Sequence, residues 1–97
     1  MDLKDIRETI RKKYHHLDVK SGPLFLLAVL FEEVGELAEA VRKNEIESIE
    51  EELADVLFMV LSLSNLFNVS PEKRLIEKYV MDDPSGRWDL PEDQHNL

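Results

Sequence analysis

Two long apolar stretches, joined by only about four residues, constrain this chain more than any other feature of its sequence. Apolar side chains recur at helical spacing over residues 23–43 and again over about 48–67, with residues 44–47 between them. A connection this short forces two helices to lie antiparallel, as a hairpin. In places each helix is apolar on nearly every side, and such a helix must be covered on every side.

Two shorter helices are predicted to flank this hairpin, at about residues 2–17 and 71–81. They are too few and too short to cover it alone. We therefore expect an all-α fold, in which an antiparallel helical bundle is built around the hairpin and completed by oligomerisation, as a homodimer or homotetramer. Residues 1–81 would form one domain, and residues 82–97 an irregular acidic tail.

The ends of the predicted helices carry recognisable signals. Asp2 is a suitable N-cap for the first helix, and Pro23 suits the first turn of the second. Asn44 can adopt the left-handed conformation that ends a helix. Ser48 and Glu51 form an S-x-x-E capping-box pattern, which places the start of the third helix near Ser48.

Composition excludes several classes of function. The chain has 12 Lys and Arg residues against 21 Asp and Glu residues, and its net charge of −9 argues against binding nucleic acid. It has no Cys, which excludes disulfides, thiolate zinc sites and cysteine nucleophiles. Residues 1–5 contain no signal-peptide core, and the longest apolar stretches are too short or too charged to cross a bilayer. We expect a cytoplasmic protein that binds no membrane.

Acidic residues occur where apolar ones are expected. Residues 21–68, the most hydrophobic part of the chain, contain ten acidic and only two basic residues. Glu33 and Glu36 continue an apolar stripe of the first hairpin helix, and Glu52 and Asp55 continue one of the second. Charges avoid apolar surroundings unless something compensates them, so these four carboxylates need a partner.

The hairpin brings these carboxylates together. Residues of an antiparallel pair face each other when their numbers have equal sums, and both Glu33 with Asp55 and Glu36 with Glu52 sum to 88. The interaxial gap is about 8–10 Å, and no Lys, Arg or His lies on either stripe. A hard divalent cation would remove the resulting repulsion, and a site made only of carboxylates suits Mg²⁺ or Mn²⁺.

The same residues resemble two motifs of a known family. Residues 32–36 read E-E-V-G-E and residues 52–55 read E-L-A-D, which match the E-E-x-x-E and E-x-x-D motifs of MazG-like nucleotide pyrophosphohydrolases, the all-α NTP pyrophosphatases. The resemblance covers roughly residues 3–80. It implies Mg²⁺-dependent hydrolysis of a nucleoside triphosphate to the monophosphate and pyrophosphate, for cleaning or regulating the nucleotide pool. It also implies that the metal ligands are Glu33, Glu36, Glu52 and Asp55.

The resemblance extends to the last helix and to the assembly. Lys78 and Tyr79 match a K-Y pair of small family members, which implies a phosphate contact at Lys78. Arg74, four residues earlier on the same side of the helix, is a second source of such contacts. Family members assemble as dimers or tetramers. Because one Mg²⁺ leaves four carboxylates with a net negative charge, we expect more than one cation per site.

Several positions depart from the family pattern. Ser21 stands where small members have an Arg, and residues 26–29 lack the Thr and Trp that those members carry before the E-E pair. These differences leave the preferred base open. No Ser/His/Asp triad is suggested, so the nucleophile is water, with Glu32 as a candidate general base although about 100° of helix separates it from Glu33.

Two other functions remain open from the sequence. One is phosphoribosyl-ATP pyrophosphatase, which uses similar carboxylates, although Phe58 and Met59 stand where its members have Tyr-His. The other is a catalytically silent helical oligomer that acts as an interaction module. Binding of Mg²⁺ distinguishes this module from the two enzymes.

Overall fold

The computed structural model describes residues 1–82, so the predicted tail, apart from Asp82, lies outside the described residues. The described part consists of α1 (Leu3–Ser21), α2 (Pro23–Lys43), α3 (Ile46–Leu66), α4 (Pro71–Leu75) and the π-helical segment η1 (Ile76–Val80), which continues α4. Residues 1–82 contain no strand, and the all-α prediction is confirmed.

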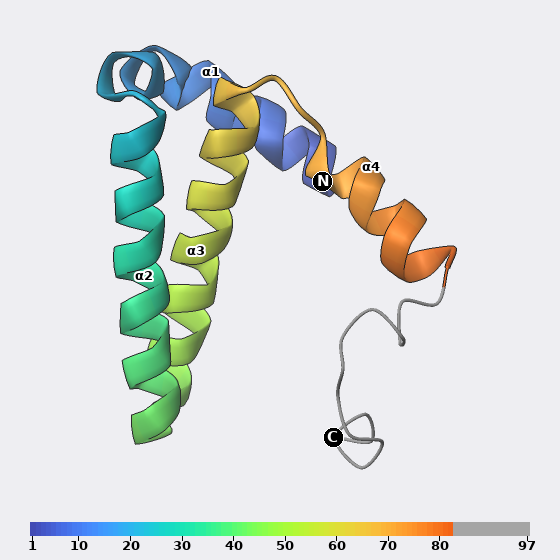
Figure 1. Cartoon of the computed structure of the whole chain (residues 1–97). Helices are drawn as coiled ribbons and strands as arrows, with labels where there is room; N and C mark the ends of the chain where they lie inside the picture. The colour runs from blue at the N-terminus through green and yellow to red at the C-terminus, as the bar shows by residue number, and fades with distance from the viewer. Residues whose placement is uncertain (83–97) are drawn as a thin grey trace.

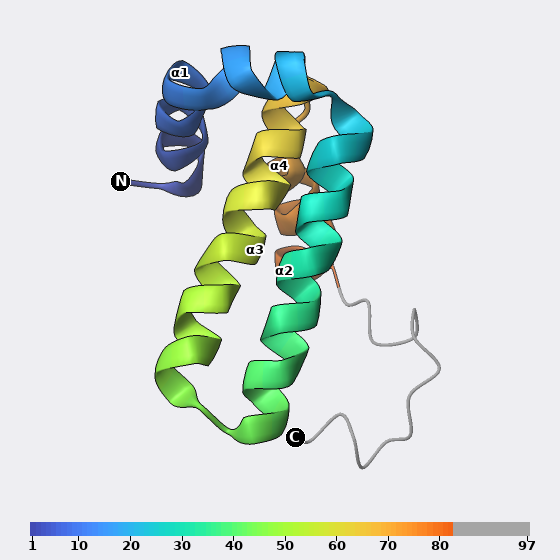
Figure 2. The ribbon, with the colours of Figure 1, turned by 90° about the vertical axis from the view of Figure 1, so that its left-hand side faces the viewer.

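Helices α2 and α3 form the predicted antiparallel hairpin and pack on each other more extensively than any other pair of elements. They lie side by side, with the turn at one end and α1 across the other (Figures 1 and 2). Asn44 makes the turn in the predicted left-handed conformation, with a φ of 56°, and its N–H donates to the carbonyls of Ala40 and Val41. One residue in this conformation reverses the chain, which is why the connection can be so short.

Two helix ends differ from the prediction. Helix α1 continues to Ser21 instead of ending near Leu17, because Gly22 is the first residue that takes a positive φ, 87°, without steric cost. Helix α3 begins at Ile46, since the chain is already reversed at Asn44, and the predicted capping box is therefore wrong. Ser48 lies inside the first turn, and its hydroxyl donates to the Glu45 carboxylate at 3.3 Å.

The apolar core is small for a chain of this composition. Leu26 and Ala40 of α2 and Met59 and Leu61 of α3 are its buried hydrophobic members among the described residues. Tyr14 attaches α1 to α3 by an edge-to-face contact with Phe58, with ring centroids 5.3 Å apart. Many large apolar side chains of the hairpin stay exposed, so a single chain leaves much of the hairpin uncovered.

A polar cluster joins α4 to the rest of the molecule. Arg7 of α1 is 5% exposed, and its guanidinium donates to Glu72 Oε1 over 2.9 Å from Nε and 2.7 Å from Nη2. The same guanidinium donates to the Ser70 hydroxyl at 3.4 Å. Asn65 of α3 donates to the Arg7 backbone carbonyl at 3.1 Å. These contacts hold together the point where the chain bends by 113° between α3 and the α4–η1 segment.

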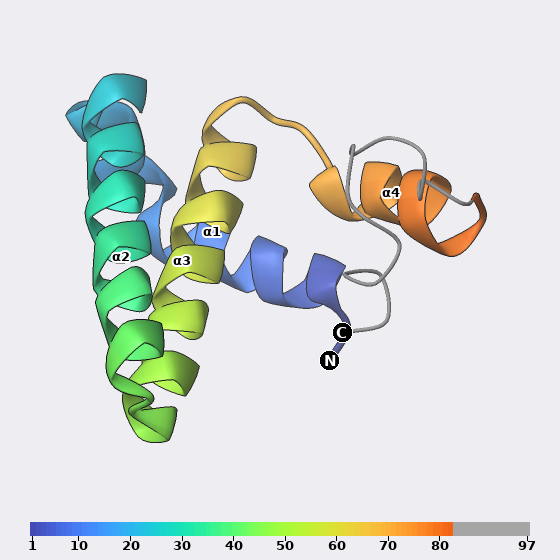
Figure 3. The ribbon, with the colours of Figure 1, turned by 60° about the horizontal axis from the view of Figure 1, so that its bottom comes forward.

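From this joint, α4–η1 leads away from the hairpin (Figures 1 and 3). Within residues 1–82, no single helix is both long and apolar enough to span a membrane. Helix α3 together with α4–η1 meets that test as a bent pair, on length and composition only.

Candidate metal centre

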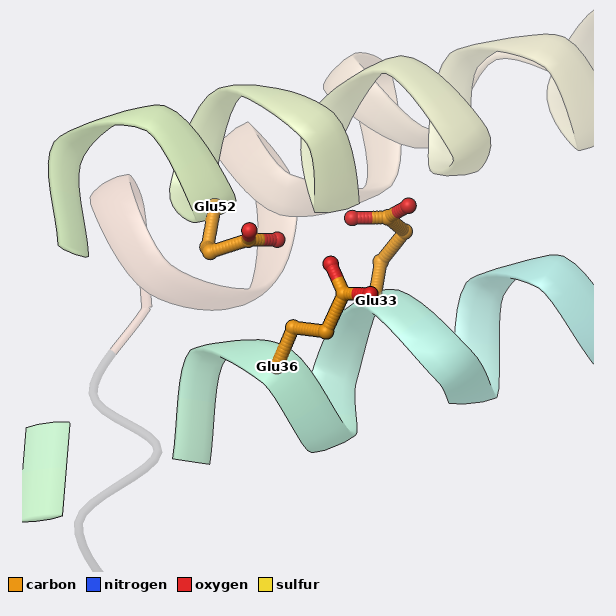
Figure 4. A group of neighbouring side chains, drawn as sticks. All are labelled: Glu33, Glu36 and Glu52. Atoms are coloured by element: carbon orange, nitrogen blue, oxygen red, sulfur yellow. The ribbon is translucent and has the colours of Figure 1, made fainter. Parts of the chain in front are cut away.

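Three carboxylates converge between α2 and α3. Glu33 and Glu36 lie on one side of α2 because they are three residues apart, and Glu52 of α3 lies opposite them because of the hairpin register. Figure 4 shows the three side chains pointing toward one another across the gap. One oxygen of each carboxylate lies within 4.8 Å of one oxygen of both others.

This group has no neutralising partner among the described residues. Glu33 and Glu52 are half-buried, Glu36 is exposed, and no ion pair involves any of them within residues 1–82. The Oε2 atoms of Glu33 and Glu52 are buried and accept no hydrogen bond. Ionised carboxylates only accept hydrogen bonds, so these oxygens cannot satisfy each other.

The closeness of these carboxylates favours the protonated form of one of them. A hydrogen bond to Glu33 raises the pKa of Glu52 from 4.5 to about 7, with further contributions from burial and from the negative charge of Glu36. Protonated Glu52 can donate to Glu33, which relieves one unit of negative charge. A cation bound between the same oxygens would displace this proton.

Two predicted site residues are not part of this group. Asp55 lies on α3 one turn beyond Glu52 and is exposed, and its carboxylate is not among the three that converge. Glu32 is exposed on α2, beside Glu33 in sequence but turned about 100° away from it. Three of the four proposed ligands therefore converge in this conformation, and Asp55 does not.

The two basic residues proposed for phosphate binding lie elsewhere in the chain. Arg74 belongs to α4 and Lys78 to η1, the segment that leads away from the hairpin (Figure 3). Arg74 is exposed and paired with Glu77, at 3.4 Å. Within one chain, the structure does not bring these side chains to the three carboxylates.

A hollow of about 310 Å³ adjoins the carboxylate group at the turn end of the hairpin. Lys43 is its basic lining residue, with Nζ 2.9 Å from Glu39 Oε1, and this hydrogen bond raises the pKa of the lysine. Lys43 was not among the predicted site residues. The prediction that neither stripe carries a basic residue is wrong at this end of α2, because Lys43 follows Glu36 by seven residues and so lies on the same side of the helix. The hollow is lined by Glu36, Glu39, Ala40, Lys43, Glu45, Ser48 and Glu52.

The donor set suits a hard divalent cation. All three ligand groups are carboxylates, two of them carry buried oxygens without a partner, and neither His nor Cys contributes. Oxygen donors of this kind favour Mg²⁺ or Mn²⁺ over Zn²⁺, and three carboxylates on two helices leave room for water or a substrate oxygen. The arrangement can therefore hold a cation at the edge of an open hollow.

Comparison with known proteins agrees with this arrangement. The sequence profile of the MazG nucleotide pyrophosphohydrolase domain matches residues 21–83, which include both helices of the hairpin and all three converging carboxylates. The chain is also 34% identical, over 85 residues, to the uncharacterized protein YpjD of Bacillus subtilis (strain 168), with 74% of this chain and 76% of that protein covered. This chain therefore belongs to the MazG nucleotide pyrophosphohydrolase domain family.

Proposed function

We propose that this protein is a Mg²⁺-dependent nucleoside triphosphate pyrophosphohydrolase that converts NTP and water into NMP and pyrophosphate. The observation that carries the proposal is the convergence of Glu33, Glu36 and Glu52 without a neutralising partner, on the two helices that the family profile matches. Asp55, one turn beyond Glu52, is proposed as a fourth ligand. The setting we propose is the cytoplasmic nucleotide pool, and the assembly a homodimer or homotetramer.

The residues of the chain divide the work of the reaction. The carboxylates would hold Mg²⁺, and because one Mg²⁺ leaves a site of this charge negative, we propose two or more ions per site. Bound Mg²⁺ supplies an acidified water and neutralises charge on the phosphoryl oxygens. Glu32 is proposed to accept the proton of the attacking water, and the bond that breaks joins the α-phosphorus to the oxygen bridging to the β-phosphate.

Lys43 is the basic residue placed beside this site in the same chain. We propose that it exchanges its partner Glu39 for an oxygen of the leaving pyrophosphate, because it lines the hollow next to Glu36 and Glu52. Arg74 and Lys78 remain proposed phosphate contacts, and in the conformation described they would have to reach a site on another subunit.

Release of pyrophosphate tests the proposal. A panel of canonical and damaged nucleoside triphosphates is incubated with the protein in millimolar Mg²⁺ or Mn²⁺, with Glu36→Gln as the inactive control. We expect pyrophosphate and the monophosphate in equal amounts from at least one of them, and none in EDTA. If no triphosphate is cleaved and neither metal changes the melting temperature, the chain is a catalytically silent helical module instead.

A further inference from the structure

A cavity opens where the start of α1 meets the start of α4. It measures about 400 Å³ and is lined by Lys4, Arg7, Ser70, Glu72 and Lys73. Three of these residues are basic and one is acidic, so the lining carries a net positive charge in a chain whose net charge is −9. The cavity therefore attracts anions, and none of its lining residues is assigned to the proposed reaction.

Arg7 and Glu72 form the fixed part of this cavity. The side chain of Arg7 is 7% exposed, and its guanidinium donates to Glu72 Oε1 from both Nε and Nη2. The same guanidinium donates to the Ser70 hydroxyl at 3.4 Å. These contacts pair one positive charge with one negative charge, so the positive charge that remains for a ligand belongs to Lys4 and Lys73.

Lys4 and Lys73 line the cavity from two different helices and have no carboxylate partner. Lys4 belongs to α1 and Lys73 to α4, and neither makes an ion pair within residues 1–82. Each ammonium group offers several N–H donors and no acceptor. Two such groups in one cavity suit an anion with several oxygen atoms, such as phosphate or sulfate.

Glu72 determines which of these anions fits. Its Oε1 atom accepts from Arg7, but its Oε2 atom is buried and accepts no hydrogen bond. Burial acts to raise the pKa of this carboxyl, but its hydrogen bond with Arg7 and the charges of Arg7 and Lys4 lower the pKa overall, so Glu72 is ionised at neutral pH. Its free oxygen repels a fully ionised oxyanion and accepts from one that carries an O–H group. Inorganic phosphate keeps a proton at neutral pH, whereas sulfate keeps none.

We propose that this cavity binds a phosphate group that carries a proton, with its ionised oxygens on Lys4 and Lys73 and its O–H donating to Glu72 Oε2. Free phosphate and a phosphate monoester both supply such a group. A second hollow of about 550 Å³ shares Ser70 and Lys73 with the cavity and leaves room for the organic part of an ester. The inference is independent of the proposed reaction, because binding is measured without metal and without a triphosphate.

Calorimetric titration of the metal-free protein at constant ionic strength tests the site. At pH 8, inorganic phosphate is expected to bind with a Kd of about 1 mM or lower. Sulfate is expected to bind at least about 10-fold more weakly, because it leaves Glu72 Oε2 without a donor.

Ribose 5-phosphate distinguishes the two sources of the phosphate group. A monoester loses its second proton at about pH 6, so it is expected to bind at pH 5.5 and not at pH 8. Tighter binding of the ester than of free phosphate at pH 5.5 identifies an ester as the ligand, and the reverse order identifies free phosphate. Binding of the ester at pH 8 as tight as that of free phosphate would contradict the hydrogen bond to Glu72.

Substitutions of the lining residues locate the binding. Lys4→Gln and Lys73→Gln each remove one ammonium group and are expected to weaken phosphate binding about 10-fold. Lys13→Gln is the matched control, because Lys13 is exposed and lies on the opposite side of α1 from Lys4. Lys43→Gln, in the hollow beside the three carboxylates, is also expected to keep the wild-type affinity for phosphate. Glu72→Gln supplies an N–H donor to the ligand and is expected to bind sulfate as tightly as phosphate.

Three results would each overturn the proposal: no binding of phosphate, equal affinity of the wild type for phosphate and sulfate, or equal losses in Lys73→Gln and Lys13→Gln. Circular dichroism checks that each variant keeps its helices. If Glu72→Gln does not fold, the comparison of sulfate with phosphate on the wild type still decides the role of Glu72 Oε2.

Discussion

Two regions of the molecule place charged side chains against apolar helices in different ways. The first holds the three converging carboxylates of Glu33, Glu36 and Glu52 between α2 and α3, and the second holds the Arg7–Glu72 pair beside α4. In the second region the chain neutralises itself, because Arg7 lies 2.7 Å from Glu72 and also donates to Ser70. In the first region, three carboxylates share a small space with no cation from residues 1–82. This difference is the reason we propose that a cation from solution binds in the first region.

The two regions also differ in what they do to a carboxyl group. Burial acts to raise the pKa of Glu72, but hydrogen bonds from Arg7 and the backbone and the charges of Arg7 and Lys4 oppose it, and the net pKa is lowered. The pKa of Glu52 is instead raised to about 7 by its hydrogen bond to Glu33 and by burial. The surroundings of Glu72 stabilise the ionised form of its carboxyl group, and the surroundings of Glu52 stabilise the protonated form.

Removing one of the three converging carboxylates should have the largest effect on activity. Glu36→Gln and Glu52→Gln keep the size of the side chain but remove its charge, and each is expected to lower kcat by about 1,000-fold with the fold retained. The double variant should lose little more, because ligands of one ion act as a unit. Glu47→Gln, on the exposed surface of α3, is the control. Equal small effects at positions 36, 47 and 52 would contradict a metal site at Glu36 and Glu52.

Replacing Arg7, the positively charged member of the Arg7–Glu72 pair, should instead lower the stability of the fold. Arg7→Met leaves Glu72 without its partner and is expected to lower the free energy of unfolding by about 3 kcal/mol in urea denaturation. Arg74→Met removes an exposed ion pair with Glu77 and should cost less than about 0.5 kcal/mol. If the two substitutions cost the same, the buried pair does not hold α4 in place.

Asp55→Asn distinguishes three ligands from four. If Asp55 joins the group when metal binds, its substitution should remove more than nine-tenths of the pyrophosphatase activity, and apo stability should hold or rise because a repulsive charge is lost. A variant that keeps more than about a tenth of the wild-type rate, measured as pyrophosphate release in saturating Mg²⁺, would leave three ligands.

The opposite pKa shifts predict opposite dependences of stability on pH in EDTA. The proton on Glu52 is bound more tightly in the folded state. Its contribution to stability is therefore present below pH 4.5 and is lost as the pH rises through about 7. The contribution of Glu72 to stability is present above pH 4.5 and is lost as the pH falls through the lowered pKa of Glu72. In melting curves, Glu52→Gln should therefore lack the loss of stability above pH 4.5 and keep the loss in acid. Glu72→Gln should lack the loss in acid and keep the loss above pH 4.5.

The smallest expected effect concerns Lys43. Lys43→Gln should raise KM for the triphosphate a few-fold and change kcat less, because the phosphate that we propose the lysine contacts is not the one that water attacks. Arg42→Gln, next to it on α2 and 73% exposed at the side chain, is the control. Equal KM values for both variants would remove Lys43 from the site.

The sequence was sufficient to predict the hairpin and the convergence of Glu33, Glu36 and Glu52, because both follow from local rules. Helical spacing places Glu33 and Glu36 on one side of α2, and the short turn at Asn44 sets the register that brings Glu52 opposite them. Neither step needs contacts from distant parts of the chain. The helix ends at Ser21 and Ile46 were less predictable, since several residues near each end are compatible with both helix and turn.

Tertiary structure decided where the remaining charges lie. The sequence alone made Arg7 one charge among several on α1, and only the bend after α3 brings Glu72 to it. The same bend carries the α4–η1 segment, to which Arg74 and Lys78 belong, away from the hairpin (Figure 3). Such contacts join residues far apart in sequence, and they depend on the angle between packed helices, which side-chain packing sets and helical periodicity does not encode.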